Sequence, residues 1–282
     1  MRVLITGANG QLGHDVMLEA SRRGWDAIGA DLPDFDLTDR AKTLAVLEKA
    51  QPDCVIHCAA YTAVDKAESE PELARAVNAR GTGYIAEYCA GRGIWMLYVS
   101  TDYVFNGSGS RPREVDDMPA PLNVYGKTKL EGERTVQALR EKHMIVRTSW
   151  VFGSHGSNFV KTMLRLGSER PELKIVSDQV GAPTYTADLA RLLCDMADRP
   201  VKGIYHAANA GECSWAQFAA KIFELSRLPC RVNEIPSCEY PQPAQRPKNS
   251  RLSSKALLAA GYEALPPWES ALADMLMTVE RG

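Results

Sequence analysis

A tyrosine and a lysine stand four residues apart in the stretch NVYGKTKLEGE, residues 123–133. If this stretch is helical, Tyr125 and Lys129 lie one turn apart on the same face, because side chains at positions i and i+4 are neighbours on a helix. A tyrosine hydroxyl is ordinarily too weak an acid to exchange its proton near neutral pH, and an adjacent positive charge makes that exchange easier. The pair therefore predicts an acid–base site, although the same spacing also occurs on solvated helices that have no chemical role.

Three glycines follow the first apolar run, in the stretch GANGQLG at residues 7–13. Gly7 allows a tight turn, Gly10 lets backbone N–H groups approach a pyrophosphate, and Gly13 lets a helix pack closely on a strand. A helix that begins here presents its partial positive charge to the phosphates. Because the turn lies between a predicted strand and a predicted helix, it predicts dinucleotide binding. The residues of the turn that we expect to contact the cofactor are Gly7, Asn9, Gly10, Gln11, Leu12 and Gly13.

An acidic residue, Asp31, ends the second predicted strand. A carboxylate at this point can accept hydrogen bonds from the adenosine ribose and repels a 2′-phosphate, which favours NADH weakly. The arginines nearest in sequence could still accommodate NADPH, so the choice between NADH and NADPH stays open. Asp36 and Leu37 lie where a loop could cover the adenine, or where an ordinary turn precedes a helix.

Composition and charge restrict the class of protein. The chain has 282 residues, of which 45% are hydrophobic and 24% charged, as in ordinary soluble globular proteins. The formal net charge of −2 gives no support for nucleic-acid binding. We expect no membrane association, because no apolar run reaches the length of a span and no signal region is recognisable. The seven cysteines form no CxxC pair, so we expect reduced thiols and a cytoplasmic protein.

Short apolar runs alternate with longer helical patterns through the first half of the chain. This alternation predicts βαβ units and an α/β fold with a doubly wound parallel sheet. The predicted strands are 2–7, 26–31, 54–60, 96–101 and 144–149, and the predicted helices are 12–23, 39–50, 72–91 and the one that carries Tyr125.

After residue 150 the pattern changes, which suggests a smaller second α/β lobe built partly from returns of the chain. We expect a dinucleotide-binding domain over 1–150, with returns near 185–210, and a substrate-binding lobe mostly over 151–282. The predicted elements are a helix at 158–168, a strand at 173–178, a loop at 179–186, a helix at 187–197, a strand at 203–208, a helix at 214–227, a Pro-rich run at 236–247 and two C-terminal helices.

Thr101 ends the predicted strand MLYVST. In a doubly wound sheet the carboxyl ends of the strands face the ligand crevice. The helix of Tyr125 begins close enough along the chain to return to the same edge. Thr101, Tyr125 and Lys129 can therefore converge on one carbonyl group beside a nicotinamide, whereas Thr101 alone could equally be a strand-end hydroxyl bonded to backbone.

Several further motifs resemble the extended short-chain dehydrogenase/reductase family over nearly the whole chain. The motifs GANGQLG and YGKTK are typical of the superfamily. The stretch STDYVF also belongs to the resemblance. A branch that acts on a nucleotide sugar is indicated by the stretches YTAVDKAESEPELA, RTSWVFG, DQVGAPT and RPKNSRL.

The resemblance implies a Rossmann fold and reduction of the C4 ketone of dTDP-4-dehydro-L-rhamnose to dTDP-L-rhamnose by NADH or NADPH, a step that supplies surface polysaccharide synthesis. By this resemblance, Tyr125 donates the proton to the developing alkoxide. Lys129 lowers the pKa of Tyr125 and holds the nicotinamide ribose, and Thr101 hydrogen-bonds the carbonyl oxygen. The hydride comes from the cofactor. Ala59 and Ala60 complete the expected cofactor contacts.

The second lobe should hold the nucleotide sugar. Trp150 offers a flat apolar face for the deoxysugar, although a tryptophan at a strand end can equally be buried core. The guanidinium of Arg246 suits the paired oxygens of a diphosphate; a solvated charge run is the alternative, and the Pro-rich setting and the resemblance favour substrate binding. The resemblance implies further substrate contacts from Val64, Asp102, Asn158, Gln179, Asn249 and Ser250. It assigns Asn78 a supporting role near the sheet, and we expect His57 and His206 to be packed rings without a catalytic role.

Three alternative functions belong to related proteins. Dehydratases of this kind carry Asp-Glu after the threonine, because elimination needs a second acid–base group, and here the residues are Asp102 and Tyr103. Net reduction is therefore the better fit. Epimerases share the hydride chemistry but regenerate their cofactor within each turnover. A non-catalytic regulator, like the regulatory subunit of methionine adenosyltransferase, would keep the dinucleotide site without turnover.

The assembly of the chain is poorly determined by the sequence. Members of the family often pair, some through a metal-linked contact of acidic residues near the C-terminus, so a homodimer is compatible with the resemblance. Glu269 matches one acidic position of that contact, but the rest of the acidic pattern is not clear in ESALADMLMTVERG. We therefore predict no metal site.

Overall fold

A six-stranded parallel sheet forms the centre of the larger lobe in the computed structural model, which describes residues 1–138 and 141–280. The strands lie in the order β10-β5-β4-β3-β1-β2, and each neighbouring pair is parallel. The predicted doubly wound sheet is confirmed. Its strands are β1 (Arg2–Thr6), β2 (Asp26–Ala30), β3 (Cys54–His57), β4 (Trp95–Thr101), β5 (His143–Thr148) and β10 (Gly203–His206).

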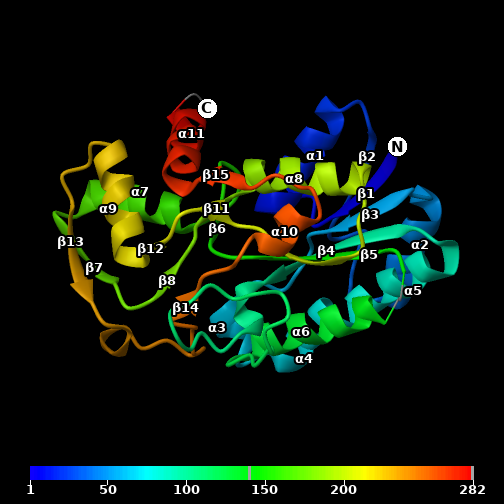
Figure 1. Cartoon of the computed structure of the whole chain (residues 1–282), viewed down its shortest axis with the longest axis horizontal. Coiled ribbons are helices and arrows are strands. Elements are labelled where there is room, and N and C mark those ends of the chain that lie inside the picture. Colours follow the sequence, from blue (N-terminus) through cyan, green and yellow to red (C-terminus); the bar gives the residue numbers. More distant parts are fainter. Residues whose placement is uncertain (139–140, 281–282) are drawn as a thin grey trace.

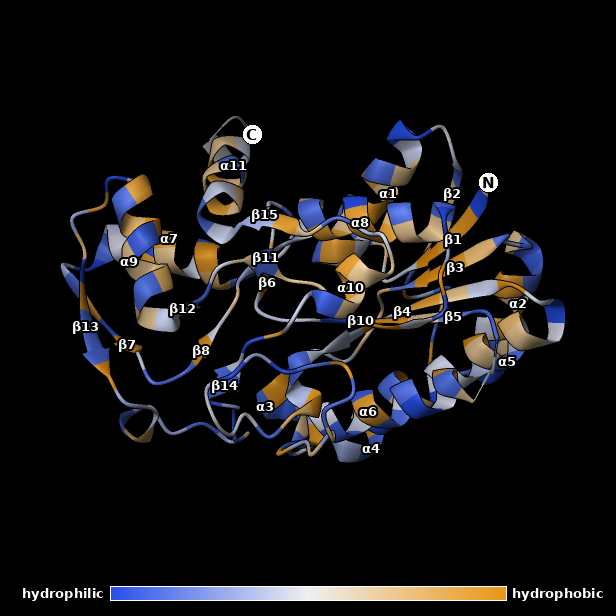
Figure 2. Cartoon of the chain, in the orientation of Figure 1, coloured by the Kyte–Doolittle hydropathy of each residue, from blue (hydrophilic) through white to orange (hydrophobic). Residues whose placement is uncertain are grey.

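Helices cover both faces of this sheet (Figure 1). Helices α1 (Gln11–Arg22) and α8 (Thr186–Asp198) pack together against one face and share a buried cluster with it. Helices α2 (Arg40–Ala50), α5 (Thr82–Arg92) and α6 (Val124–Gln137) cover the other face. The strands between these two layers are hydrophobic along most of their length (Figure 2), as expected for strands that are buried on both sides.

The predicted helix at 72–91 is interrupted. Helix α4 (Pro71–Arg75) leads into a π-helical segment (Ala76–Gly81), and α5 follows. Within the widened segment, Asn78 reaches out to other elements: its Oδ1 accepts from the backbone N–H of Tyr61 at 2.8 Å, and its Nδ2 donates to the Thr128 hydroxyl at 3.1 Å. The periodicity of the sequence does not reveal this π-helical interruption, because the interruption depends on contacts with residues distant in the chain. Such π-helical turns are frequent near functional sites.

The second lobe is built around an aromatic cluster that joins α7 (Phe159–Glu169), α9 (Trp215–Leu225) and α11 (Trp268–Glu280). The described residues also form four small sheets. They pair β7 (Glu172–Val176) with β13 (Arg231–Ile235), β8 (Val180–Gly181) with β12 (Cys213–Ser214) and β14 (Asn249–Ser250), β6 (Val151–Phe152) with β9 (Thr184–Tyr185), and β11 (Asn209–Ala210) with β15 (Leu265–Pro267). The remaining short helices are α3 (Val64–Ala67) and α10 (Lys255–Ala259), with 3₁₀ turns at Asp102–Val104 and Ser237–Glu239.

The prediction of a loop over 179–186 was wrong. This stretch contains β8 and β9, and the next helix starts at Thr186. Both strands are two residues long, and their partners lie between about 30 and 70 residues away in the chain. Pairs of this kind leave no periodic signal in the sequence.

The chain returns to the large lobe after leaving it. Strand β10 adds to the edge of the central sheet beside β5, and α8 packs on α1. Leu257, Tyr262 and Leu265 also join the buried cluster beneath α1. Among residues 1–138 and 141–280, no helix has the length and apolar character needed to cross a membrane.

Candidate active site

The glycine-rich turn joins β1 to α1 with its backbone folded tightly. Gly7 has φ = +69°, and a Cβ at this position would lie 2.8 Å from the Cα of Ala59. A Cβ at Gly13 would collide with the carbonyl oxygen of Gly7. Gly10 precedes the first residue of α1 and makes no side-chain cap. The turn therefore leaves backbone N–H groups and a helix N-terminus at the sheet edge, as a pyrophosphate requires.

A cavity of about 1080 Å³ extends from this turn along the carboxyl ends of the strands. Its volume and shape suit a molecule of dinucleotide size. All the cofactor-binding residues expected from the sequence contribute to its wall: Gly7, Asn9, Gly10, Gln11, Leu12, Gly13, Asp31, Asp36, Leu37, Ala59, Ala60, Tyr125 and Lys129. Asp31 already holds the turn, because its Oδ2 accepts from the backbone N–H of Asn9 at 2.9 Å.

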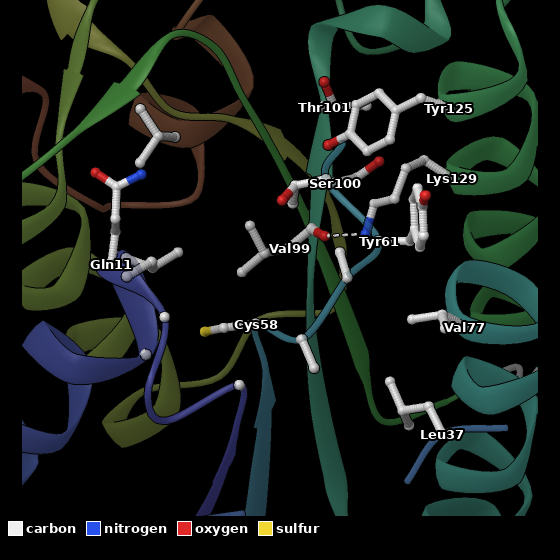
Figure 3. A pocket seen from close by; sticks show the side chains of 18 of the residues that line it. Gln11, Leu37, Cys58, Tyr61, Val77, Val99, Ser100, Thr101, Tyr125 and Lys129 are labelled. Carbon is white, nitrogen blue, oxygen red and sulfur yellow. Dashed lines mark hydrogen bonds between the residues drawn. The ribbon is translucent and has the colours of Figure 1, made fainter. Parts of the chain in front are cut away.

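Thr101, Tyr125 and Lys129 meet at one end of this cavity (Figure 3). Thr101 is the last residue of β4, and Tyr125 and Lys129 lie on the first turns of α6. Asn123 caps this helix by accepting from the backbone N–H of Gly126 at 2.8 Å. The hydroxyl of Tyr125 points toward Thr101, and the Nζ of Lys129 donates to the carbonyl oxygen of Val99 at 2.7 Å.

Burial shifts the pKa of both members of the pair. Burial raises the pKa of Tyr125 to about 12, with a smaller lowering by the Thr101 hydroxyl. Burial lowers the pKa of Lys129 to about 7, against a raising effect of Glu133. Burial is the largest effect on this phenol, and the lowering of its pKa by Lys129 stays a prediction. Tyr125 is consequently a protonated phenol at neutral pH, and Lys129 is close to its titration midpoint.

Asp102 supplies a buried carboxylate beside the same residues. Its Oδ1 accepts from the Thr101 hydroxyl at 3.1 Å. Its Oδ2 is buried without a hydrogen-bond partner among the described residues. Burial raises the pKa of Asp102 to about 6. A carboxyl group in this position can accept a hydrogen bond from a bound hydroxyl, and together with Val64 and Trp150 it lines the cavity near Thr101.

The other residues predicted to contact the substrate do not line the first cavity. Gln179 and Arg246 line a second cavity of about 640 Å³, between the small sheets and the Pro-rich run. Asn249 and Ser250 are buried in β14 and are not in the wall of either cavity. Asn158 caps α7 through the backbone N–H of Lys161, and its Nδ2 donates to Gln11 at 2.9 Å.

Comparison with known protein families identifies one family that matches nearly the whole chain. Residues 1–281 match the family described as RmlD substrate binding domain. The chain belongs to this RmlD family. A dTDP-4-dehydrorhamnose reductase of Sinorhizobium fredii is 41% identical over 280 residues, which cover 95% of this chain and 94% of the relative.

Solved structures of RmlD-like proteins have the same fold as this chain. A dTDP-4-dehydrorhamnose reductase from Clostridium acetobutylicum superposes with a TM-score of 0.96 at 40% identity, covering 99% of this chain and 100% of that one. A dTDP-4-dehydrorhamnose reductase from Bacillus anthracis, solved in complex with NADP, has a TM-score of 0.95 at 41% identity and covers 98% and 99% of the two chains.

Two aromatic residues of this RmlD-family chain were missed by sequence reasoning. Trp215 stacks on Trp150 with ring centroids 3.7 Å apart, and its Nε1 donates to Gln179 at 3.2 Å. Tyr103 packs edge-on against Tyr125, with centroids 5.6 Å apart. Trp215 lies 65 residues after Trp150, so only the fold brings the two indoles together. Tyr103 directly follows Asp102, and its place two residues after Thr101 was a usable signal.

The histidines expected to be packed do have partners. The Nδ1 of His57 lies 2.6 Å from the Thr6 hydroxyl, and its Nε2 lies 3.0 Å from the Thr82 hydroxyl. His206 is held by the carbonyl oxygen of Arg113. Burial lowers the pKa of both rings to about 3, so both are neutral at physiological pH.

Proposed function

We propose that this chain reduces the C4 ketone of dTDP-4-dehydro-L-rhamnose to dTDP-L-rhamnose, using NADPH or NADH. The observation that carries the proposal is the meeting of Thr101, Tyr125 and Lys129 at one end of a dinucleotide-sized cavity. It is supported by the RmlD family match over 1–281 and by a relative with this activity in its name.

The glycine-rich turn fits the cofactor because a side chain at Gly7 or Gly13 would collide with backbone. In the proposed complex the N–H groups of this turn hold the pyrophosphate. Asp31 lies where the adenosine ribose would be held, and Leu37 lies near the adenine. Lys129 is placed to donate to the nicotinamide ribose. When bound, the nicotinamide supplies the hydride for the reduction.

Tyr125 acts as the proton donor in this proposal. At neutral pH its phenol keeps its proton, because burial raises its pKa to about 12. As negative charge develops on the ketone oxygen, the Tyr125 hydroxyl transfers its proton to that oxygen and the Thr101 hydroxyl donates a hydrogen bond. A protonated Lys129 then stabilises the phenolate that remains. The carbonyl carbon gains a hydride and the oxygen gains a proton, which completes the alcohol.

Arg246 is suited to the diphosphate of the substrate. Its Nη1 donates to Asp65 Oδ1 at 2.9 Å and to the carbonyl oxygen of Ala244 at 3.0 Å, and its Nη2 donates to Asp65 Oδ2 at 2.7 Å. Three of the five N–H donors of the guanidinium are thereby used. The Nε and the second Nη2 hydrogen have no acceptor among the described residues, and they lie on one edge of the group. Two parallel donors of this kind match two oxygens of a phosphate.

Tyr125 and Asp102 lie beside the first cavity, and Arg246 and Gln179 line the second. We propose that the sugar lies near Thr101, Asp102 and Trp150, with Val64 alongside, and that the nucleotide extends toward Gln179. On this proposal Asn158, Asn249 and Ser250 act by shaping the site, since the polar atoms of Asn158 and Asn249 already have partners within the protein.

The location and the assembly are proposals as well. We propose a cytoplasmic enzyme, because all seven cysteines are free and reduced thiols are typical of that compartment. A homodimer stays a prediction from family resemblance, to be tested by light scattering on the purified protein.

No group of three or more metal-ligating side chains occurs in the part of the chain that the structure describes.

The proposal is tested by turnover of NADPH and NADH with a panel of 4-keto sugar nucleotides that differ in base and sugar. We expect the fastest reaction with dTDP-4-dehydro-L-rhamnose, one reduced cofactor consumed per product, and dTDP-L-rhamnose as the product. Isomerised sugar without net loss of reduced cofactor would indicate an epimerase instead. Binding of cofactor without turnover of any sugar would indicate a regulatory protein.

A further inference from the structure

A buried carboxylate lies one helical turn below the proposed proton-transfer pair. Glu133 follows Lys129 by four residues and Tyr125 by eight, so the three side chains occupy one face of α6. Its side chain is only 1% exposed. A charged group is costly to bury unless it is paired and hydrogen-bonded. The buried carboxylate of Glu133 therefore needs cationic and hydrogen-bonding partners.

Glu133 connects α6 to two strands of the central sheet. Its Oε1 accepts from the Ser100 hydroxyl at 2.6 Å and from the Nε of Arg147 at 2.9 Å, and its Oε2 accepts from the Nη2 of Arg147 at 2.7 Å. Ser100 on β4 and Arg147 on β5 are direct neighbours in the sheet register. One carboxylate thus holds the catalytic helix against both strands.

The strand end held by Glu133 carries the remaining parts of the proposed chemistry. Ser100 lies between Thr101, which faces the ketone in the proposed complex, and Val99, whose carbonyl oxygen accepts from Lys129 Nζ at 2.7 Å. Figure 3 shows Val99, Ser100 and Thr101 on one strand opposite Tyr125 and Lys129. A shift of β4 relative to α6 would move all of these groups together.

Glu133 is also the group that raises the pKa of Lys129 most. Arg147 from β5 pairs with this carboxylate, and Lys129 lies one turn away on the same helix. Cys58 from the end of β3 has a smaller influence of the same sign on Lys129. Asp102, also buried in this region, has a pKa raised to about 6 and is mostly charged at neutral pH. The other titratable groups around the lysine and the carboxylate are uncharged there: His57, Tyr98, Tyr125 and His206. Without Glu133, the buried guanidinium of Arg147 would lose its carboxylate partner, and Lys129 would lose the group that raises its pKa most.

We propose that Glu133 is a positioning residue of the reductase: it holds the end of β4 against the helix of Tyr125 and Lys129 and supplies a buried negative charge that favours the protonated form of Lys129. This inference rests on the proposed function for its effect on rate. Its effect on Lys129 concerns the free protein and stands apart from any substrate.

The test compares Glu133→Gln with Glu131→Gln, which removes a charge from the exposed side of the same helix, where Glu131 pairs with Arg75. Titration of the lysine side chains is followed by carbon NMR on protein labelled at lysine Cε, without substrate, and the Lys129 signal is assigned by its loss in Lys129→Met. We expect Glu133→Gln to lower the titration midpoint of Lys129 by about one pH unit and Glu131→Gln to leave it in place. An unchanged midpoint in Glu133→Gln would overturn the charge role.

Removing one partner of a buried ion pair is strongly destabilising, so Ser100→Ala provides a second measurement that keeps the Glu133–Arg147 pair intact. We expect kcat to fall about tenfold while KM for the cofactor and the Lys129 midpoint stay the same, because only the placement of β4 changes. A parental kcat in Ser100→Ala would overturn the positioning role.

If the parent protein has no reductase activity, the proposed function fails, and the NMR titration still decides whether Glu133 controls the protonation of Lys129.

Discussion

Arg246 and Asp65 form a two-point ion pair that joins the two lobes, with Nη1–Oδ1 at 2.9 Å and Nη2–Oδ2 at 2.7 Å. Asp65 lies on α3, directly after the cavity residue Val64, and also accepts from the backbone N–H of Ala244 at 3.1 Å. Hydrogen bonding from Arg246 lowers the pKa of Asp65, so the carboxylate is charged at neutral pH. The pair orients the guanidinium edge that we assign to the diphosphate.

We expect Arg246→Lys and Asp65→Asn each to raise KM for the nucleotide sugar by about tenfold to a hundredfold, since charge-assisted hydrogen bonds contribute roughly 1.5–3 kcal/mol. A lysine keeps the charge but cannot bond Asp65 and a phosphate through two parallel pairs. Steady-state kinetics would show this increase with KM for the cofactor unchanged. Arg111→Lys is the control, because Arg111 is an exposed arginine paired with Asp117. An unchanged KM for the sugar in both variants would remove Arg246 from the substrate site.

Tyr125→Phe should bind cofactor with the parental affinity and lose most of its turnover, because one phenolic oxygen supplies the proton and contributes little to binding. General acid catalysis is typically worth about 10²- to 10⁴-fold in rate, and we expect a loss in this range. Fluorescence titration with NADPH measures the binding, and stopped assays measure product. Parental turnover by the variant would show that another group is the acid.

Gly13→Ala should abolish tight cofactor binding and destabilise the fold, because a Cβ at this position collides with the carbonyl oxygen of Gly7. Gly91→Ala is the matched control. Gly91 lies near the end of α5, where an added Cβ would meet no atom within 4 Å, and alanine should stabilise such a helical position by up to about 1 kcal/mol. Calorimetric binding of NADPH and urea unfolding distinguish the two variants. If Gly13→Ala binds the cofactor normally, the turn does not hold the pyrophosphate.

His57 should make the protein less stable in mild acid. Burial lowers its pKa from the ordinary value of 6.5 to about 3, so the unfolded chain binds the additional proton between these values. Stability therefore falls as pH falls from 6.5 toward 3, and the loss between pH 7 and pH 5 from this one ring is about 2 kcal/mol. Urea unfolding at the two pH values should show that His57→Gln loses about this much less stability than the parent. Equal pH dependence in parent and variant would contradict the neutral buried ring.

The cofactor side of the molecule was largely predictable because its signals are local. The five predicted strands and the glycine-rich turn each depend on short runs of sequence. The observed strands β1, β2 and β3 lie within the predicted ranges, and β4 and β5 each begin one residue earlier than predicted. The two-residue strands β8 and β9 and the π-helical segment at Ala76–Gly81 were missed, since they are set by partners far away in the chain.

By itself, the sequence determined the alternation of strands and helices, the dinucleotide turn and the one-turn spacing of Tyr125 and Lys129, because these follow from periodicity and backbone sterics. Only the tertiary structure decided the protonation of that pair, the stacking of Trp150 on Trp215, and the ties of Asp65 to Arg246 and of Glu133 to Ser100 and Arg147. Burial and charge pairing act through space between residues distant in sequence, and a residue acquires them only when the chain has packed around it.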